Sequence, residues 1–279
     1  IIPLHFKYNY ERRTAYSSSS NDAKNGERET KMRLINIKTF VTHFVLLMSV
    51  VLSPLSAFEI ENLPVQSEGR IKPLDTFARN HLLRFYGKRE VKEQQLKATD
   101  WLLDLILDPE NGRDLKIFNI RNPEVVSSLF LDWTTDHKYS YNEIIDGLKN
   151  QLDLINAIDQ KDNSDRSPFE KQLIELSQNA IIFEELIYMK NIKLIPPGLL
   201  DENAVWQSPY DFIISGVTPA YHQEEILNSL QKYLASRFQN NKSEMNSALT
   251  SYEKIVSGLP MSSLDVRKLK DETWMNEVE

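Results

Sequence analysis

Cysteine is absent from this chain of 279 residues, and glycine is scarce, with 8 residues. Without thiols the chain can form no disulfide, no thiolate metal site and no cysteine nucleophile. The shortage of glycine argues against a glycine-rich nucleotide-binding fold and against a β protein with many turns. Segments rich in Leu, Ile, Lys, Glu and Gln favour helix. We therefore predict a mainly α fold, a helical bundle or stacked helical pairs with at most two short strands.

Charge is distributed unevenly along the chain. Residues 1–57 hold eight of the 33 basic and four of the 40 acidic side chains, so the remainder has 25 basic and 36 acidic residues. An acidic body repels phosphate backbones, which argues against nucleic acid as a partner. It also argues against non-specific adhesion to anionic lipid.

The N-terminal segment has the organisation of an export signal. The first methionine is Met32, basic residues precede the apolar run 40–52, and Leu55-Ser56-Ala57 offers a cleavage site. The run is shorter than the roughly 20 residues of a membrane span. We interpret 1–31 as a non-native or disordered leader and 32–57 as a signal peptide or signal anchor. Residues 58–279 are then an extracytoplasmic helical domain, which we expect to be truncated before a membrane domain.

Several local patterns predict helix and strand boundaries. Ser140 with Glu143, and Ser167 with Glu170, form capping boxes. Asp75 is positioned to cap a helix that Gly87 ends. Residues 116–120 and 193–195 are the two strand candidates, and residues 242–257 are expected to pack antiparallel to the helix before them.

A short segment near the start of the domain has an unusual composition. Residues 64–78 read PVQSEGRIKPLDTFA, with Gln66 in an extended stretch and a turn at Gly69. Arg70 and Lys72 alternate along the next extended stretch, where they share one face. Two cations there can bind an anion such as a carboxylate. The alternative is a turn that docks the N-terminus on the helices, with Arg70 paired to an acid.

This segment resembles the start of the extracytoplasmic domain in bacterial system II cytochrome c synthesis proteins of the CcsA/ResB type. Weaker likenesses extend over about residues 60–279. The resemblance implies an accessory domain that assists haem attachment at the periplasmic face of the inner membrane. Its implied partners are apocytochrome c and membrane cytochrome c synthesis subunits. The haem-handling residues of that family lie on membrane helices, so any haem would come through the wider complex.

Histidine is the remaining candidate for haem chemistry. The domain contains His81, His137 and His222, which are not at metal-ligand spacing. His81 lies between Phe77 and Phe85 at helical spacing, so it is the haem-ligand candidate, although a histidine on a helix face is more often structural.

No catalytic motif and no metal-binding motif is recognisable in the chain. Three functions are compatible with the sequence. The first is the cytochrome c assembly domain, and the second is a free periplasmic helical module that binds a peptide or small ligand. The third is an enzyme whose site no motif marks.

Overall fold

The computed structural model describes residues 58–91, 95–197, 205–259 and 266–278. These residues belong to one compact unit that begins at Phe58. The predicted leader and signal segment, 1–31 and 32–57, lie outside the described residues, and both stay predictions. Among the described helices, none combines the length and the apolar character needed to span a bilayer.

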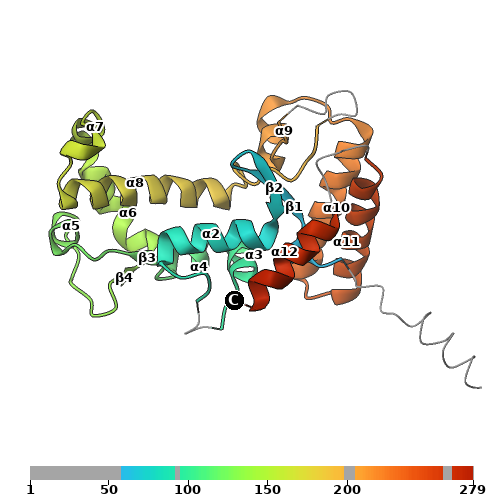
Figure 1. Cartoon of the computed structure of the whole chain (residues 1–279), viewed down its shortest axis with the longest axis horizontal. Coiled ribbons are helices and arrows are strands. Elements are labelled where there is room, and N and C mark those ends of the chain that lie inside the picture. Colours follow the sequence, from blue (N-terminus) through green and yellow to red (C-terminus); the bar gives the residue numbers. More distant parts are fainter. Residues whose placement is uncertain (1–57, 92–94, 198–204, 260–265, 279) are drawn as a thin grey trace, which may run out of the picture. The chain divides into compact units, whose positions relative to one another are not determined.

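The mainly α fold class is confirmed, with eleven α-helices and two short two-stranded antiparallel sheets in the described ranges (Figure 1). The α-helices are α2 (Leu74–Tyr86), α3 (Ala98–Leu107), α4 (Pro109–Asp114), α5 (Pro123–Ser128), α6 (Tyr141–Asn150), α7 (Leu152–Asp159), α8 (Pro168–Ile187), α9 (Pro209–Ser215), α10 (Tyr221–Phe238), α11 (Lys242–Ser257) and α12 (Val266–Val278). Two 3₁₀ turns are η1 (Ile60–Asn62) and η3 (Asn163–Asp165), and the strands are β1 (Pro64–Ser67), β2 (Arg70–Pro73), β3 (Phe118–Asn119) and β4 (Lys138–Tyr139).

Both predicted capping boxes start helices. The Ser140 hydroxyl accepts from the Glu143 amide at 3.2 Å, and the Glu143 carboxylate accepts from the Ser140 amide at 2.7 Å. Ser167 makes the same reciprocal pair at the start of α8. The helix predicted after Ser140 divides at Gln151, whose side chain donates to the Ser128 carbonyl at 3.0 Å. A long-range contact therefore ends α6 where the local pattern predicts continuation.

The short strands are more numerous than expected. β1 and β2 form a hairpin in which Val65 pairs with Lys72 and Ser67 with Arg70. β3 lies inside the predicted strand 116–120 and pairs with β4. Residues 193–195 form no strand; they make isolated bridges to Gln66 and Gln207. The strands are too short to show an alternation of apolar and polar residues, and the partners in the isolated bridges are distant in sequence. The hydrophobic pattern of the sequence therefore did not reveal these pairings.

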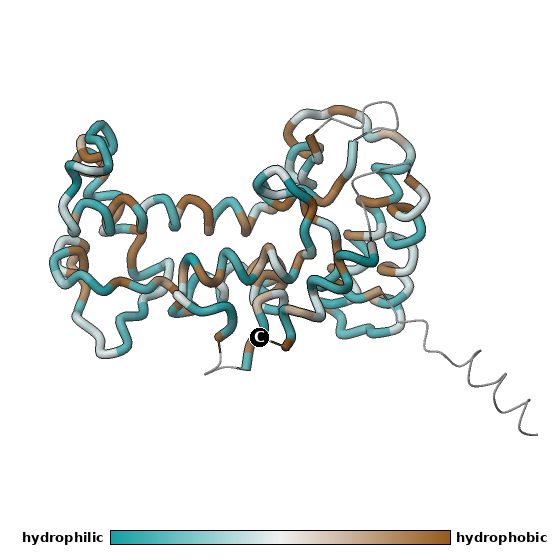
Figure 2. The backbone as a smooth tube through the Cα atoms, viewed as in Figure 1, coloured by the Kyte–Doolittle hydropathy of each residue, from teal (hydrophilic) through white to brown (hydrophobic). Residues whose placement is uncertain are grey.

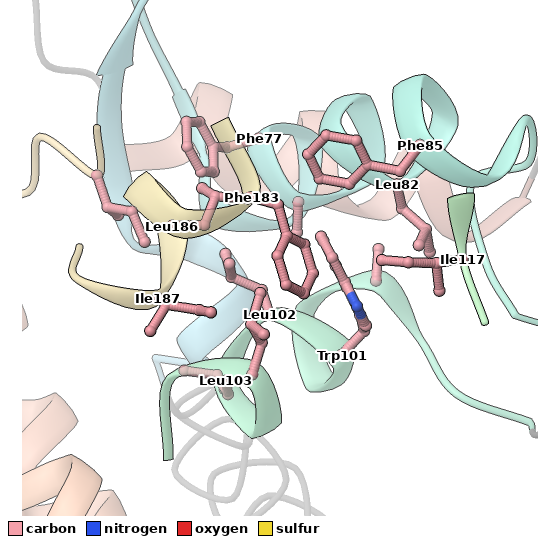
Figure 3. Packing of buried hydrophobic residues seen from close by; sticks show 14 of the residues in the cluster. Phe77, Leu82, Phe85, Trp101, Leu102, Leu103, Ile117, Phe183, Leu186 and Ile187 are labelled. Carbon is pink, nitrogen blue, oxygen red and sulfur yellow. The ribbon is translucent and has the colours of Figure 1, made fainter. Parts of the chain in front are cut away.

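The core lies where α2, α3 and α8 meet (Figure 3). The Phe85 ring lies 6.0 Å from both Trp101 and Phe183 and 5.6 Å from Phe118, measured between centroids. All four side chains are almost completely buried. Hydrophobic and hydrophilic residues alternate along α2 and α8 (Figure 2), as expected of helices that bury one face.

The helices α10 and α11 form the predicted antiparallel pair (Figure 1). Tyr252 is one contact that joins this pair to the rest of the domain: it is buried and donates its hydroxyl proton to the Leu194 carbonyl at 3.1 Å. The Tyr252 ring also stacks on Phe58, with centroids 6.3 Å apart. These contacts hold the helical pair against the start of the domain.

Gly147 marks a close approach between α6 and the end of α5. A Cβ atom at Gly147 would lie 2.8 Å from the Leu129 carbonyl oxygen and 2.9 Å from the Leu129 Cβ. At Gly258 the nearest atoms to an added Cβ are 3.4 Å away, an ordinary contact. Gly147 therefore tests the close approach, and Gly258 serves as its control.

We expect Gly147→Ala to lower the free energy of unfolding by about 1–3 kcal/mol, because backbone atoms must move to admit the methyl group. Gly258→Ala should change it by less than about 0.5 kcal/mol. Urea denaturation of the two variants and the wild type measures both values. Equal effects of the two substitutions would contradict the close approach.

Candidate functional site

The β1–β2 hairpin holds the sequence motif and places Gln66 and Gly69. Glu68 and Gly69 both have positive φ, 53° and 78°, which is the backbone of a two-residue type I′ turn. Gly69 is exposed at this tip, and nothing lies within 4 Å of the Cβ it lacks. The side-chain carbonyl of Gln66 accepts from the Trp206 backbone amide at 2.8 Å, and the Gln66 backbone amide donates to the Lys193 carbonyl at 3.0 Å. Gln66 thus ties the hairpin to two later segments.

Both cations of the motif have carboxylate partners. The Arg70 guanidinium makes a two-pronged contact with Glu272 of α12, at 3.0 and 3.2 Å. The Lys72 ammonium lies 2.7 Å from the Glu68 carboxylate, and its side chain is only 2% exposed. The contact with Lys72 holds the pKa of the Glu68 carboxyl below its ordinary value. An anionic ligand would have to compete with these carboxylates; the anion contact stays a prediction.

Asp75 does not cap α2, so that prediction was wrong. The N-cap residue is Pro73, and the Leu74 amide donates to the Leu63 carbonyl at 2.8 Å. Asp75 lies in the first turn and is almost completely buried. Its carboxylate accepts three hydrogen bonds from side chains of three helices: Arg79 of α2 at 2.8 Å, Thr99 of α3 at 3.3 Å and Asn276 of α12 at 3.0 Å.

Helix α12 is attached to the hairpin and α2 mainly by polar contacts. Besides Arg70, the Glu272 carboxylate accepts from the Thr76 hydroxyl at 2.7 Å. Asn276 donates to the Thr76 hydroxyl at 2.9 Å. Burial alone would raise the pKa of Glu272, but the hydrogen bonds from Arg70 and Thr76 outweigh it and lower the pKa.

A hollow of about 490 Å³ opens beside the hairpin tip. It brings together three of the predicted site residues, Gln66, Gly69 and His81, while Arg70, Lys72 and Asp75 are not among its lining residues. The full lining is Gln66, Ser67, Glu68, Gly69, Phe77, His81, Ile182, Asn191, Lys193 and Val205.

His81 presents one unpaired ring nitrogen among the described residues. Its Nδ1 lies 2.9 Å from the Phe77 carbonyl oxygen and therefore carries the proton, and its ring lies 4.3 Å from the Phe77 ring. No described residue makes a hydrogen bond to Nε2. Burial lowers the pKa of His81 below its ordinary value, against the raising effect of the Phe77 carbonyl. A neutral imidazole with an unused Nε2 can accept a proton or bind a metal.

Lys193 supplies a cation in the same hollow, and the sequence analysis did not identify it as a site residue. Its side chain has no ion pair or hydrogen bond with any residue that the structure describes. The only sequence signal is a single charge inside the apolar stretch 192–197. Phe77, Ile182 and Val205 add apolar wall. Glu68 also lines the hollow, and its side chain is 79% exposed, so the lining offers one carboxylate and one ammonium side chain beside the apolar wall. An anionic group of a ligand would have to lie toward Lys193 and away from Glu68.

The chain matches no protein-family model and no curated protein sequence. Within the described ranges, no three histidine or carboxylate side chains gather closely enough to hold a metal ion. The interpretation of this site therefore depends on its own geometry and on the sequence motif.

We expect Glu272→Gln to reduce stability at neutral pH by about 0.5–1 kcal/mol, the range of partly exposed ion pairs. Because the pKa of Glu272 is lowered in the folded state, its stabilisation is present above the ordinary value of about 4.3. It is lost as the pH falls through the folded-state value. Denaturation at pH 7 and pH 3 should therefore show a smaller effect at pH 3.

The matched control is Asp146→Asn, in an exposed pair with Lys149 at 3.1 Å. It should change stability little at either pH. The role assigned to Glu272 is contradicted if Glu272→Gln has no larger effect at pH 7 than this control.

His81 gives a second pH prediction. Because its pKa is lowered in the folded protein, the unfolded chain takes up the proton first as the pH falls through about 6.5. Stability should therefore decrease between pH 7 and pH 5, and His81→Gln should remove this part of the decrease. Nitrogen NMR of the imidazole should show the proton on Nδ1 and a midpoint below the ordinary value. A midpoint above it would contradict the buried, neutral ring.

Proposed function

We propose that this domain is an accessory extracytoplasmic part of a cytochrome c assembly protein at the periplasmic face of a bacterial inner membrane. One observation supports this most directly. The motif that resembles system II cytochrome c synthesis proteins forms the hairpin, and its residues Gln66 and Gly69 share one hollow with His81. The segment that carries the resemblance is thus also the segment that shapes the candidate site.

Haem attachment adds a thiol across a vinyl group, so it demands positioning more than a protein nucleophile. The chain has no cysteine and offers no recognisable acid–base pair, in keeping with a positioning role. Its proposed partners are apocytochrome c and membrane cytochrome c synthesis subunits, and haem would come through that complex.

The hollow has side chains that suit one face of a haem. The unpaired Nε2 of His81 would be the nitrogen that binds the haem iron, and the Lys193 side chain would be the partner of a propionate. Phe77, Ile182 and Val205 would contact the apolar macrocycle. Haem bound there would supply the vinyl groups for thioether formation. The residues of this chain would hold and orient it.

The test is covalent haem staining of c-type cytochromes in the native host after deletion of the gene. We expect holocytochrome c to be lost and to return with the wild-type gene. His81→Gln and Lys193→Glu should restore it several-fold less well at equal protein level, because they remove the ligand nitrogen and the cation.

The control is Lys149→Glu, a charge reversal at an exposed lysine outside the hollow, which should restore maturation fully. Normal maturation in the deletion strain would overturn the proposed function. If His81→Gln and Lys193→Glu both restore maturation fully, the assembly role stands, but the hollow takes no part in it.

A free periplasmic module that binds a peptide or small ligand is the second candidate, and one observation favours it. A groove of about 680 Å³ lies between α3–α4 and the α10–α11 turn. It is lined in part by Trp101, whose buried Nε1 has no hydrogen-bond partner among the described residues, and by Phe238, which is 78% exposed. A buried indole donor normally finds an acceptor. The exposed Phe238 ring is the apolar surface that a peptide or small ligand in this groove would contact.

A further inference from the structure

A cluster of large apolar side chains projects from α9 and the turn after it. Ile213, Ile214, Val217 and Tyr221 are 79%, 62%, 60% and 76% exposed. We call residues 209–221 the α9 turn; it lies in the orange region of Figure 1, where Figure 2 shows hydrophobic stretches. Contiguous exposed apolar patches on a domain surface mark contact with another molecule or a membrane.

The same segment carries few charges. Asp211 is its one acidic residue, and residues 212–223 hold no Asp, Glu, Lys or Arg and one histidine, His222, although charged residues make up 26% of the chain. Asp211 is occupied in a capping box with Ser208 at the start of α9. No charged residue therefore lies between Ile213 and Val217 to oppose their removal from water, while the carboxylate of Glu225 raises the pKa of Tyr221 at the edge of the cluster.

Residues 213–218 of the α9 turn form a continuous exposed run. Gly216 ends α9 in the left-handed region, with φ of 62°, and nothing lies within 4 Å of the position of a Cβ. Thr218 and Pro219 follow, and α10 begins at Tyr221. An exposed apolar turn can enter the acyl boundary of a bilayer, which needs no cavity shaped to receive it.

Tyrosine and lysine border the cluster. The Lys190 ammonium lies 4.9 Å from the centre of the Tyr210 ring on α9 and 5.8 Å from that of Tyr188. Tyr188 is 53% exposed. Tyrosine rings and lysine ammonium groups are the side chains that favour the headgroup region, while aliphatic side chains favour the acyl boundary.

We propose that the α9 turn is a membrane-contact surface that places Ile213, Ile214 and Val217 in the interfacial region of a phospholipid bilayer. Apolar burial drives the contact, because the acidic body gains nothing from anionic headgroups. A protein partner fits less well, since the α9 turn has no arginine and no tryptophan, two of the side chains that dominate protein interfaces, although its two tyrosines suit either kind of contact. The inference rests on the proposed function only for the placement beside a membrane.

The chain has no cysteine, so a single introduced cysteine can carry a spin label in the full-length protein. Ile214→Cys reports on the α9 turn, and Ile181→Cys on α8 is the control, because the two isoleucines are 62% and 59% exposed. The labelled proteins are mixed with vesicles of phosphatidylethanolamine and phosphatidylglycerol. Accessibility of each label to oxygen and to a water-soluble nickel complex is then measured.

At position 214, vesicles should raise accessibility to oxygen and lower accessibility to nickel several-fold, while position 181 should stay accessible to nickel. Adding Ile213→Ser and Val217→Ser to the Ile214→Cys protein should weaken the change about tenfold, because two aliphatic side chains no longer leave water. Circular dichroism checks that these surface variants remain folded.

Equal behaviour of the two labels would overturn the membrane contact. So would a label at 214 that becomes protected only when native membrane proteins are present, since this result identifies a protein partner. Either outcome, with cytochrome c maturation intact, leaves the proposed function in place. Lipid contact at 214 in a protein that plays no part in maturation would refute the proposed function alone.

Discussion

The buried carboxylate of Asp75 is the contact on which the arrangement of three helices depends. A charge removed from water is tolerated only when hydrogen bonds replace the lost hydration. Asp75 obtains them from Arg79, Thr99 and Asn276, which belong to α2, α3 and α12. Moving any one of these helices would leave part of a buried charge without a partner. The position of the hairpin follows, because β2 runs directly into α2.

The domain combines two kinds of attachment. The contact among α2, α3 and α8 is an aromatic and aliphatic core, whose stability comes from area removed from water. The contact of α12 with the hairpin depends on Glu272, its contact with α2 depends on Glu272 and Asn276, and Leu269 is a buried aliphatic side chain of α12. Polar contacts of this kind are directional and sensitive to pH and salt. The hollow at the hairpin tip is lined by residues of the hairpin and by Phe77 of the core.

Local sequence signals predicted local structure well. The capping boxes at Ser140 and Ser167 and the helix end at Gly87 depend on residues within a few positions of each other, and all three are confirmed. The mainly α class follows from composition for the same reason. The division of the helix at Gln151 was missed, because its partner is the Ser128 carbonyl, far from the helix pattern.

The candidate site was predicted only in part, for a related reason. The sequence identified Gln66, Gly69 and His81, but nothing local indicated that they would line one hollow with Lys193. Asp75 was assigned to a cap because aspartate before a helix usually serves there. Of its three actual partners, Arg79 is four residues away, but Thr99 and Asn276 are 24 and 201 residues away. Contacts at that separation leave no periodic or spacing signal in a single sequence.

The turn of the hairpin shows how one buried charge restricts the residues that a backbone position can accept. A two-residue type I′ turn is most easily made by asparagine or glycine, and a glutamate with positive φ costs about 1–2 kcal/mol. At Glu68 that cost is offset, because Lys72 is 2% exposed and Glu68 is its counter-ion. Because the Glu68 side chain is 79% exposed, water also solvates this pair, and an ion pair of this kind is worth about 1 kcal/mol or less, similar to the strain. The residue at position 68 therefore balances two small opposing effects, the backbone strain of an acid in the turn and the loss of a counter-ion for Lys72.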